Sequence, residues 1–252
     1  MRAKHLRPCT TKDGTKIDLL INMEGKVPED VAWADGVGLM RSEYLYLGQP
    51  RLPDEEEQYK AYRAVLEAFP GKPVTLRTLD IGGDKELNGW PLPRESNPFL
   101  GVRGLRLCLQ YPHIFVPQLR AALRASVHGE LRLMFPMVSG LEELRAGKQL
   151  VEKVAQELGD QCPTPKWKLG VMIETPAAAL MAPQLAQEVD FASVGTNDLC
   201  QYLTAADRTN GEVAAYYQCC HPAMIHLLHH IAQSFGAAGR PVSVCGEMAS
   251  DP

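Results

Sequence analysis

Polar and ionisable side chains stand at several points where an apolar stretch of the sequence ends. The stretch SVGTNDL (193–199) passes directly from small and apolar residues to Asn197 and Asp198, and Arg208 follows ten residues after the aspartate. Burying such groups is costly unless they have a partner, so their position indicates a site. Residues of this kind are Arg41, Glu43, Arg77, Asp80, Lys85, Glu174, Asn197, Asp198, Cys245, Glu247 and Asp251.

Three arginines among them, Arg41, Arg77 and Arg208, favour an anionic ligand. Guanidinium groups gathered in one place repel each other unless they are neutralised, and their forked N–H groups suit phosphate and carboxylate. The carboxylates of Glu174 and Asp198 suit a hard divalent cation such as Mg2+, bound together with substrate oxygens and water. The combination predicts a small, highly anionic phosphorylated acid chelated to Mg2+, with charge on a phosphoryl group stabilised during transfer.

Cys245 is a candidate for proton transfer or nucleophilic attack. It lies between Val244 and Gly246 at the end of an apolar stretch, and Glu247 follows. A cysteine within a strand is more often a small buried apolar residue, which is the competing interpretation. Its place at a strand end beside a carboxylate makes it a candidate general acid or nucleophile, whereas the other cysteines lack such a setting.

Several of these residues also have purely structural interpretations. Arg41 and Glu43 are spaced for an ion pair, and Glu174 precedes a helix that its carboxylate can cap. Asp198 can serve as the N-cap of the helix after it. The GGDK segment (82–85) is a weak phosphate signal because it lacks the spacing of a P-loop.

Neither the histidines nor the cysteines indicate a metal or disulfide framework. His226 and His230 can share one helix face, but without an acidic third ligand nearby a structural role is favoured over zinc. The seven cysteines are scattered without a CxxC pair, and the vicinal Cys219 and Cys220 are interpreted as helix or loop thiols. Reduced thiols are typical of a cytoplasmic protein.

These side chains need a scaffold, and the sequence predicts a regular alternation of strands and helices. Near-continuous apolar runs are typical of parallel strands covered on both faces. The predicted strands are 16–23, 36–41, 73–81, 131–137, 168–175, 190–196 and 241–249. The predicted helices are 28–34, 54–69, 102–110, 115–126, 140–158, 176–189, 213–218 and 221–239.

Repeated βα units of this length predict an α/β fold, either a parallel barrel or a doubly wound sheet. A closed (β/α)8 barrel of the TIM type needs eight strands, whereas seven are counted. The barrel is therefore expected to lack its last βα unit. In such a barrel the carboxyl ends of all strands point to one mouth, where the polar residues above would converge.

Length and charge exclude several classes of protein. The chain has 252 residues, is 45% hydrophobic and carries a formal net charge of −4, which fits one large domain and disfavours nucleic-acid binding. It has no run of 18 apolar residues and no apolar signal core at its start, so we expect a cytoplasmic protein without membrane insertion. Residues 1–252 are expected to form a single domain, with 1–13 as an extension or linker.

Five blocks of the sequence resemble the phosphoenolpyruvate-utilising enzymes. They are TLRTLDIGGDKEL (75–87), NPFLGVRGLR (97–106), VMIETPAA (171–178), DFASVGTNDLCQYLTAADR (190–208) and VCGEMASD (244–251). The similarity runs from about Asp13 to Asp251. It is strongest to the C-terminal, phosphoenolpyruvate-binding domain of Enzyme I of the bacterial sugar phosphotransferase system, which the multiphosphoryl transfer proteins also carry.

The resemblance implies a barrel of the phosphoenolpyruvate/pyruvate type and a role for each site residue. Arg41 and Arg77 would bind the phosphate, with Arg103 and Lys85 lining the same side. Arg208 would bind the anionic groups of the substrate. The remaining implied roles are hydrogen bonding to the phosphate and carboxylate end by Asn197, Mg2+ ligation by Glu174 and Asp198, and protonation of the enolpyruvate methylene carbon by Cys245.

The implied activity is that of a phosphoenolpyruvate-protein phosphotransferase, which passes the phosphoryl group to a histidine and releases pyruvate. The acceptor would lie on a separate N-terminal phosphohistidine domain, which hands the group to the histidine-containing phosphocarrier protein of sugar transport. A homodimer is expected for the full-length protein. The alternatives are a non-catalytic binding or dimerising module, and a related enzyme such as pyruvate phosphate dikinase, phosphoenolpyruvate synthase or a Mg2+-dependent C–C lyase.

Overall fold

The structure is a computed structural model that describes residues 9–82, 90, 92, 94–162 and 167–250. Lys85 and Asp251 of the predicted site lie outside these residues. Cys9–Thr10 (β1) and Lys16–Ile17 (β2) form a short antiparallel hairpin ahead of the main sheet. The predicted first strand is therefore shorter than expected, because its first two residues belong to this hairpin.

One seven-stranded parallel sheet forms the centre of the molecule, and its strands follow one another in chain order. Each strand pairs with its sequence neighbour, as repeated βα units require. The strands are β3 (Leu20–Met23), β4 (Gly36–Arg41), β5 (Pro73–Arg77), β6 (Glu130–Phe135), β7 (Trp167–Ile173), β8 (Phe191–Gly195) and β9 (Val242–Cys245). All seven predicted strands are confirmed within a few residues.

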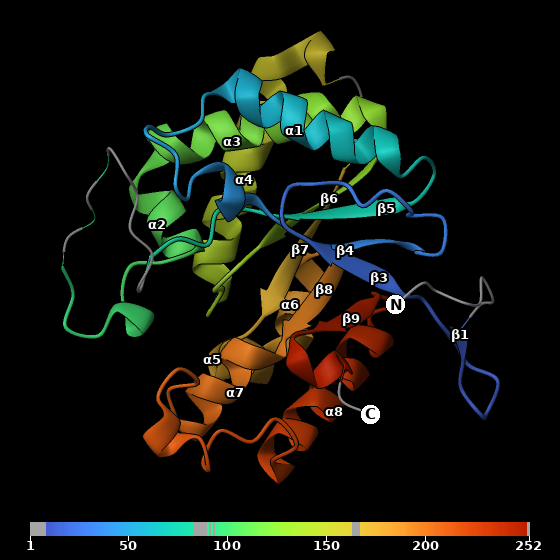
Figure 1. Ribbon diagram of the computed structural model, residues 1–252, viewed down its shortest axis with the longest axis vertical. Coiled ribbons are helices and arrows are strands. Elements are labelled where there is room, and N and C mark those ends of the chain that lie inside the picture. Colours follow the sequence, from blue (N-terminus) through green and yellow to red (C-terminus); the bar gives the residue numbers. More distant parts are fainter. Residues whose placement is uncertain (1–8, 83–89, 91, 93, 163–166, 251–252) are drawn as a thin grey trace.

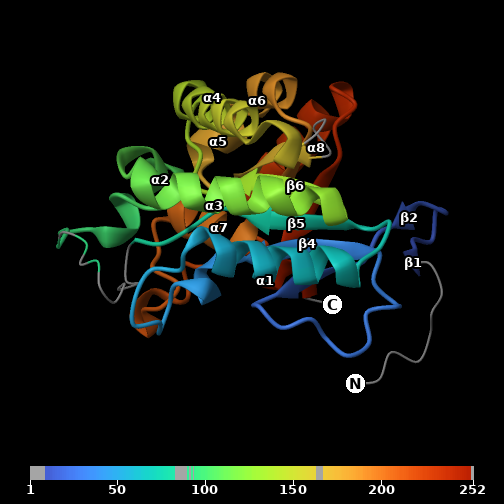
Figure 2. The same ribbon diagram turned by 90° about the horizontal axis from the view of Figure 1, so that it is seen from above.

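The sheet is curled, so that β4 and β9 approach each other across its concave side (Figures 1 and 2). The strands β3 and β9 are the two edges of the sheet in the described part of the chain. This is an α/β half-barrel of the TIM type, which confirms the predicted fold class. Its concave side opens at the carboxyl ends of the strands.

Helices cover the convex side of the sheet, with α1 and α3 packed side by side (Figures 1 and 2). The N-cap of α1 is Asp54, whose carboxylate accepts from the backbone N–H of Glu57, while the Glu57 side chain accepts in return from Asp54 N–H. The helices are α1 (Glu55–Ala68), α2 (Leu105–Gln110), α3 (Pro112–Ala125), α4 (Leu141–Leu158), α5 (Pro176–Leu180), α6 (Ala182–Glu188), α7 (Thr196–Thr204) and α8 (Pro222–Ala237).

Two helix predictions were wrong, and a third helix is interrupted. Residues 28–34 form turns, and 213–218 contain only the end of a short 3-10 helix, Gly211–Val213 (η5). Segments this short are not stable as helices without an apolar face that packs. The predicted helix 176–189 is divided at Met181 into α5 and α6, and Pro183 lies in the first turn of the second piece.

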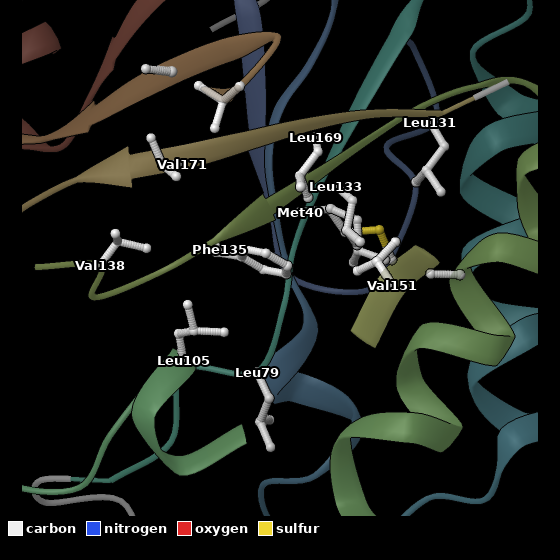
Figure 3. Close-up of a cluster of buried hydrophobic side chains, with 14 of the residues drawn as sticks. Met40, Leu79, Leu105, Leu131, Leu133, Phe135, Val138, Val151, Leu169 and Val171 are labelled. Carbon is white, nitrogen blue, oxygen red and sulfur yellow. The ribbon is translucent and has the colours of Figure 1, made fainter. Parts of the chain in front are cut away.

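The main core lies between the convex face of the sheet and the helices. Figure 3 shows Leu131, Leu133 and Phe135 of β6 pointing to the same side, toward Leu105 of α2 and Val151 of α4. Successive strand residues point to opposite faces, so Met134 of β6 lies on the concave side instead. There it joins Leu39, Met172 and Phe191 in a second, smaller apolar cluster, which Cys245 contacts.

No helix in the described ranges is both long enough and apolar enough to cross a lipid bilayer.

Candidate functional site

A cavity of about 300 Å3 opens at the carboxyl ends of the strands. The apolar side chains Leu39 and Met172, from the concave-side cluster, form part of its wall. The structure brings to this cavity all the described residues for which the family resemblance implies a role, namely Arg41, Arg77, Arg103, Glu174, Asn197, Asp198, Arg208 and Cys245. Asp80 and Glu247 also line it, whereas Glu43 does not.

Arg77, at the end of β5, is buried and held from two sides by carboxylates. Its Nη2 donates to Glu43, and its Nη1 lies 3.1 Å from Asp80 Oδ2. Burial alone would lower the pKa of this guanidinium, but the charges of Glu43, Asp80 and Glu174 raise it further above its usual range. The group is therefore a permanent cation that is already partly neutralised within the protein.

Arg103 precedes α2 and connects three elements of the site. Its guanidinium makes a forked contact with Asp80, with Nη2 at 3.0 Å from Oδ2 and Nε at 3.2 Å from Oδ1. Its Nη1 donates to Asp198 Oδ1 and to the hydroxyl of Tyr202, each at 3.2 Å. The Tyr202 hydroxyl in turn donates to the carbonyl of Phe99, so α7 and the loop carrying Phe99 are joined through one hydrogen-bond network.

Asp198 lies in the first turn of α7, where the backbone N–H groups favour a negative charge. The N-cap position belongs to Gly195, so the interpretation of Asp198 as the N-cap was wrong. Its carboxylate instead meets Arg103 on one oxygen and Arg208 on the other, the latter at 3.6 Å. The backbone N–H of Arg208 donates to Gln201 Oε1, which fixes the chain after α7.

Glu174 follows β7 and is almost completely buried, with 1% of its surface exposed. Its Oε1 accepts from the backbone N–H of Met137 at 2.7 Å. The helix after it is capped by Thr175, whose hydroxyl accepts from Ala178 N–H, so the capping interpretation of Glu174 was wrong. Burial raises the pKa of Glu174 to about 8, with added repulsion from the charges of Asp198 and Asp80.

Asn197 is connected to the end of β9 by its side chain. Its Oδ1 accepts from the backbone N–H of Glu247 at 3.0 Å, which leaves the amide NH2 group as a donor. Gly246 between the strand and Glu247 has a φ of +99°, and an added Cβ would lie 2.3 Å from Thr196 Oγ1 and 2.8 Å from Asn197 Oδ1. Only glycine allows this close approach.

Arg41, at the end of β4, is the most exposed arginine of the site. Its Nη1 lies 2.6 Å from Glu24 Oε1, and 46% of the Arg41 side chain and 64% of the Glu24 side chain are exposed. The interpretation of Arg41 as the partner of Glu43 was therefore wrong, because Glu43 pairs with Arg77. Exposed ion pairs of this kind contribute little to the free energy of unfolding, so Arg41 can exchange Glu24 for another anionic partner.

Cys245 ends β9, with its thiol turned toward the concave-side cluster. The thiol donates to the carbonyl of Val194 at 3.3 Å and accepts from the Ser193 hydroxyl at 3.6 Å. Burial raises its pKa, the Ser193 hydrogen bond opposes the shift, and the charge of Glu174 adds to it. The group is therefore a neutral thiol at physiological pH, which is a proton donor and a poor nucleophile.

The donor set of the cavity fits a hard divalent cation. Glu174 and Asp198 lie close enough for their charges to repel, and neither is exposed by more than a tenth of its surface. No group of three or more His, Cys, Asp or Glu side chains suited to a metal occurs among the described residues. Two carboxylates with room beside them are the pattern of a Mg2+ site completed by substrate oxygens and water.

Sequence reasoning missed part of the site. Asp80 and Glu43 lie at the ends of predicted strands, but this position does not predict their pairing with Arg77, and no sequence pattern singles out Phe99 or Tyr202. Asn22, at the end of β3, also lines the cavity. The signal for Asn22 was available, since it is a polar residue at the carboxyl end of a predicted strand.

The histidine pair of α8 is not part of this cavity. His226 is exposed, and His230 is partly buried, with its Nε2 lacking a hydrogen-bond partner in the described ranges. Neither side chain lines the cavity.

Residues 2–252 match a protein family described as PEP-utilising enzyme, PEP-binding domain, where PEP is phosphoenolpyruvate. The chain is also similar to proteins named phosphoenolpyruvate-protein phosphotransferase. It is 49% identical over 249 residues to the one from Geobacillus stearothermophilus, which covers 96% of this chain and 43% of that protein. The protein from Bacillus subtilis strain 168 is 45% identical over 251 residues, with 97% and 44% covered. The chain thus spans less than half the length of these relatives.

Solved structures show the same fold at low sequence identity. A Haloferax volcanii malate synthase, in a ternary complex with pyruvate and acetyl-CoA, has a TM-score of 0.55 at 14% identity, covering 91% of this chain and 58% of that chain. Its lead(II) complex has a TM-score of 0.53 at 14% identity, covering 93% and 63%.

Proposed function

Because the chain belongs to the family of PEP-utilising enzymes, whose PEP-binding domain it matches, we propose that it binds phosphoenolpyruvate with Mg2+ and donates the phosphoryl group to a histidine. The observation that carries the proposal is the convergence of four arginines and three buried carboxylates, Asp80, Glu174 and Asp198, on one cavity of about 300 Å3. A cavity of this size suits a small phosphorylated acid rather than a nucleotide.

The arginines divide between the two anionic ends of the substrate. Arg77 and Arg103, which are buried and fixed by carboxylates, would hold the phosphoryl group, together with Arg41 at the rim of the cavity. Arg208, on the opposite side of Asp198, would bind the carboxylate with the free amide donor of Asn197. Guanidinium donors fixed before the ligand arrives stabilise charge on the transferring group without reorganising.

Glu174 and Asp198 would hold the cation. When bound, Mg2+ supplies positive charge that offsets the phosphoryl and carboxylate charges of the substrate. The repulsion between the two carboxylates, which contributes to the raised pKa of Glu174, supports this assignment, because a cation between them would remove it.

Cys245 would supply the proton that completes the reaction. Transfer of the phosphoryl group breaks the bond between phosphorus and the enol oxygen and leaves the enolate of pyruvate. Its methylene carbon then takes the thiol proton, and pyruvate is released. The raised pKa of Cys245 supports this role, since the group must keep its proton until the enolate forms.

The acceptor histidine would lie outside the described cavity. No described histidine lines it, which supports a separate N-terminal phosphohistidine domain as the first acceptor and a phosphocarrier protein as the next. A homodimer of the full-length protein remains part of the proposal.

Calorimetric titration of phosphoenolpyruvate, with and without Mg2+, tests the binding step. We expect Mg2+-dependent binding by the folded chain, and its absence would refute the proposal. Addition of a separate acceptor domain tests the transfer step: phosphohistidine formation supports an enzyme, whereas binding without transfer supports the alternative of a non-catalytic binding module.

A further inference from the structure

Six charged side chains at and beside the cavity form a row that alternates in sign. In order they are Glu43, Arg77, Asp80, Arg103, Asp198 and Arg208, and each forms an ion pair with the next. Asp80 stands inside this row, between the two buried arginines. It follows β5 and lines the cavity, with 2% of its surface exposed.

Both oxygens of Asp80 are engaged. Oδ1 accepts from Nε and Nη2 of Arg103, and Oδ2 accepts from Nη2 of Arg103 and lies 3.1 Å from Nη1 of Arg77. One carboxylate therefore fixes the orientation of two guanidiniums at once. A forked contact of this kind sets the plane of the guanidinium as well as its distance.

The backbone around Asp80 is itself held in place. Leu79 N–H donates to the side chain of the buried Gln118 at 2.9 Å, and the carbonyl of Ile81 accepts from Gly104 N–H at 3.2 Å. Gly82, with a φ of +121°, leaves room for Arg103, because an added Cβ would lie 2.5 Å from Arg103 Cβ. The position of Asp80 is thus fixed by its backbone, whereas the long side chains of Arg77 and Arg103 need a contact that fixes their orientation.

We propose that Asp80 is a positioning residue that holds Arg77 and Arg103 in the orientation that receives the phosphoryl group. This inference rests on the proposed function and adds a residue to it. Asp80 also offsets the repulsion between two guanidiniums that share a buried space. It acts through the arginines and need not touch the substrate.

The variant Asp80→Asn distinguishes two roles for this carboxylate. It either positions the arginines or only competes with the substrate for them. The amide keeps the size of the side chain but replaces one accepting oxygen with an NH2 donor, which would face a guanidinium N–H. At least one arginine must then turn away. If Asp80 only competed with the substrate, removing its charge would instead strengthen the binding of anions.

The test is calorimetric titration of three probes in Mg2+: phosphoenolpyruvate, inorganic phosphate and pyruvate. With Asp80→Asn we expect both phosphoryl ligands to bind at least about tenfold more weakly. The affinity for pyruvate, which has no phosphoryl group, should stay within about twofold. Tighter binding of phosphoenolpyruvate, unchanged binding of all three probes, or equal weakening of all three would overturn the inference.

A matched control is Asp190→Asn, which makes the same change at the opposite end of the sheet, where Asp190 accepts from Leu169 N–H. It should leave all three affinities unchanged. If Asp80→Asn does not fold, Asp80→Ser, which removes the carboxylate without placing an NH2 group against the arginines, is subjected to the same titrations.

The side-chain Nε–H signal of Arg103 in a 1H–15N NMR spectrum tests the positioning without any substrate. It is expected to be protected from solvent exchange in the native protein and to lose this protection in Asp80→Asn. If the native protein binds no phosphoenolpyruvate, the proposed function fails, and the NMR result alone decides the role of Asp80. Unchanged protection in the variant would overturn it.

Discussion

Arg103 and Asp198 form a buried ion pair at 3.2 Å although 95 residues separate them in the sequence. The pair joins the segment before α2 to the first turn of α7. These two segments follow different strands of the curled sheet, β5 and β8. Asp198 is thereby shared between an arginine on the expected phosphoryl side and Arg208 on the expected carboxylate side. The two halves of the site are connected before a ligand binds.

Replacing Glu174 with glutamine should remove most of the metal affinity. The amide oxygen can still accept from Met137 N–H, so the fold should be retained, but one of two anionic ligands is lost. We expect the affinity for Mn2+, used as a spectroscopic probe for the Mg2+ site, to fall at least about tenfold. The control is Glu188→Gln, at the end of α6, where Glu188 forms an ion pair with Arg145 of α4; this variant should bind Mn2+ normally.

The same residue should make the stability of the metal-free protein depend on pH. Burial raises the pKa of Glu174 to about 8 in the folded protein, against an ordinary value of 4.5 for a glutamate. Between these values the folded state holds a proton that the unfolded state has released, so the contribution of Glu174 falls as the pH rises from about 5 to 8. Urea unfolding in EDTA at several pH values should show a steeper decline for the native protein than for Glu174→Gln, and parallel curves would contradict the assignment.

Cys245→Ala should separate binding from proton transfer. The thiol contacts Val194 and Ser193 rather than the arginines, so the affinity for phosphoenolpyruvate should be preserved. Loss of a general acid typically slows a reaction about a hundredfold or more. The rate of pyruvate release, measured with a separate histidine domain that accepts the phosphoryl group, should fall about a hundredfold or more. Unchanged turnover would refute the proton-donor role. Cys9→Ala, at an exposed cysteine in the N-terminal hairpin, is the matched control.

Gly246→Ala should damage both stability and the site. A Cβ at this position would meet Thr196 and Asn197, and the positive φ disfavours any residue other than glycine. We expect a loss of about 1–3 kcal/mol in the free energy of unfolding and weaker binding of phosphoenolpyruvate. Gly236→Ala is the control: this glycine lies in α8 with nothing within 4 Å of an added Cβ, so alanine should be neutral or stabilising. Equal stabilities for the two variants would contradict the prediction.

The scaffold was largely predictable because the strands are long apolar runs with a repeated spacing. In β6 and β7, for example, the face toward the helices is apolar throughout, whereas the concave face is apolar only near the carboxyl end, at Met134 and Met172. The helix expected after Asp198 starts earlier than the N-cap interpretation implies: α7 begins with Thr196, Asn197 and Asp198, which are weak helix formers. Its place directly after a strand, and not its propensity, makes it helical.

The members of the site were also predictable, but their partners were not. The end of a parallel strand identifies which side chains reach the mouth of a barrel. It does not say which carboxylate meets which arginine, since that depends on loop geometry. Arg41 therefore pairs with Glu24, which follows the neighbouring strand β3, and Glu43 turns toward Arg77.

The chain order of the strands has a consequence for the synthesis of the protein. Each strand pairs with the one before it, so the sheet can grow from β3 onward as the polypeptide leaves the ribosome. The cavity, however, takes Asn22 and Arg41 from the first strands and Cys245 from the last. Most of the scaffold can thus form while the cavity is still unfinished, and local detachment of β9 would abolish the site in a protein that is otherwise folded.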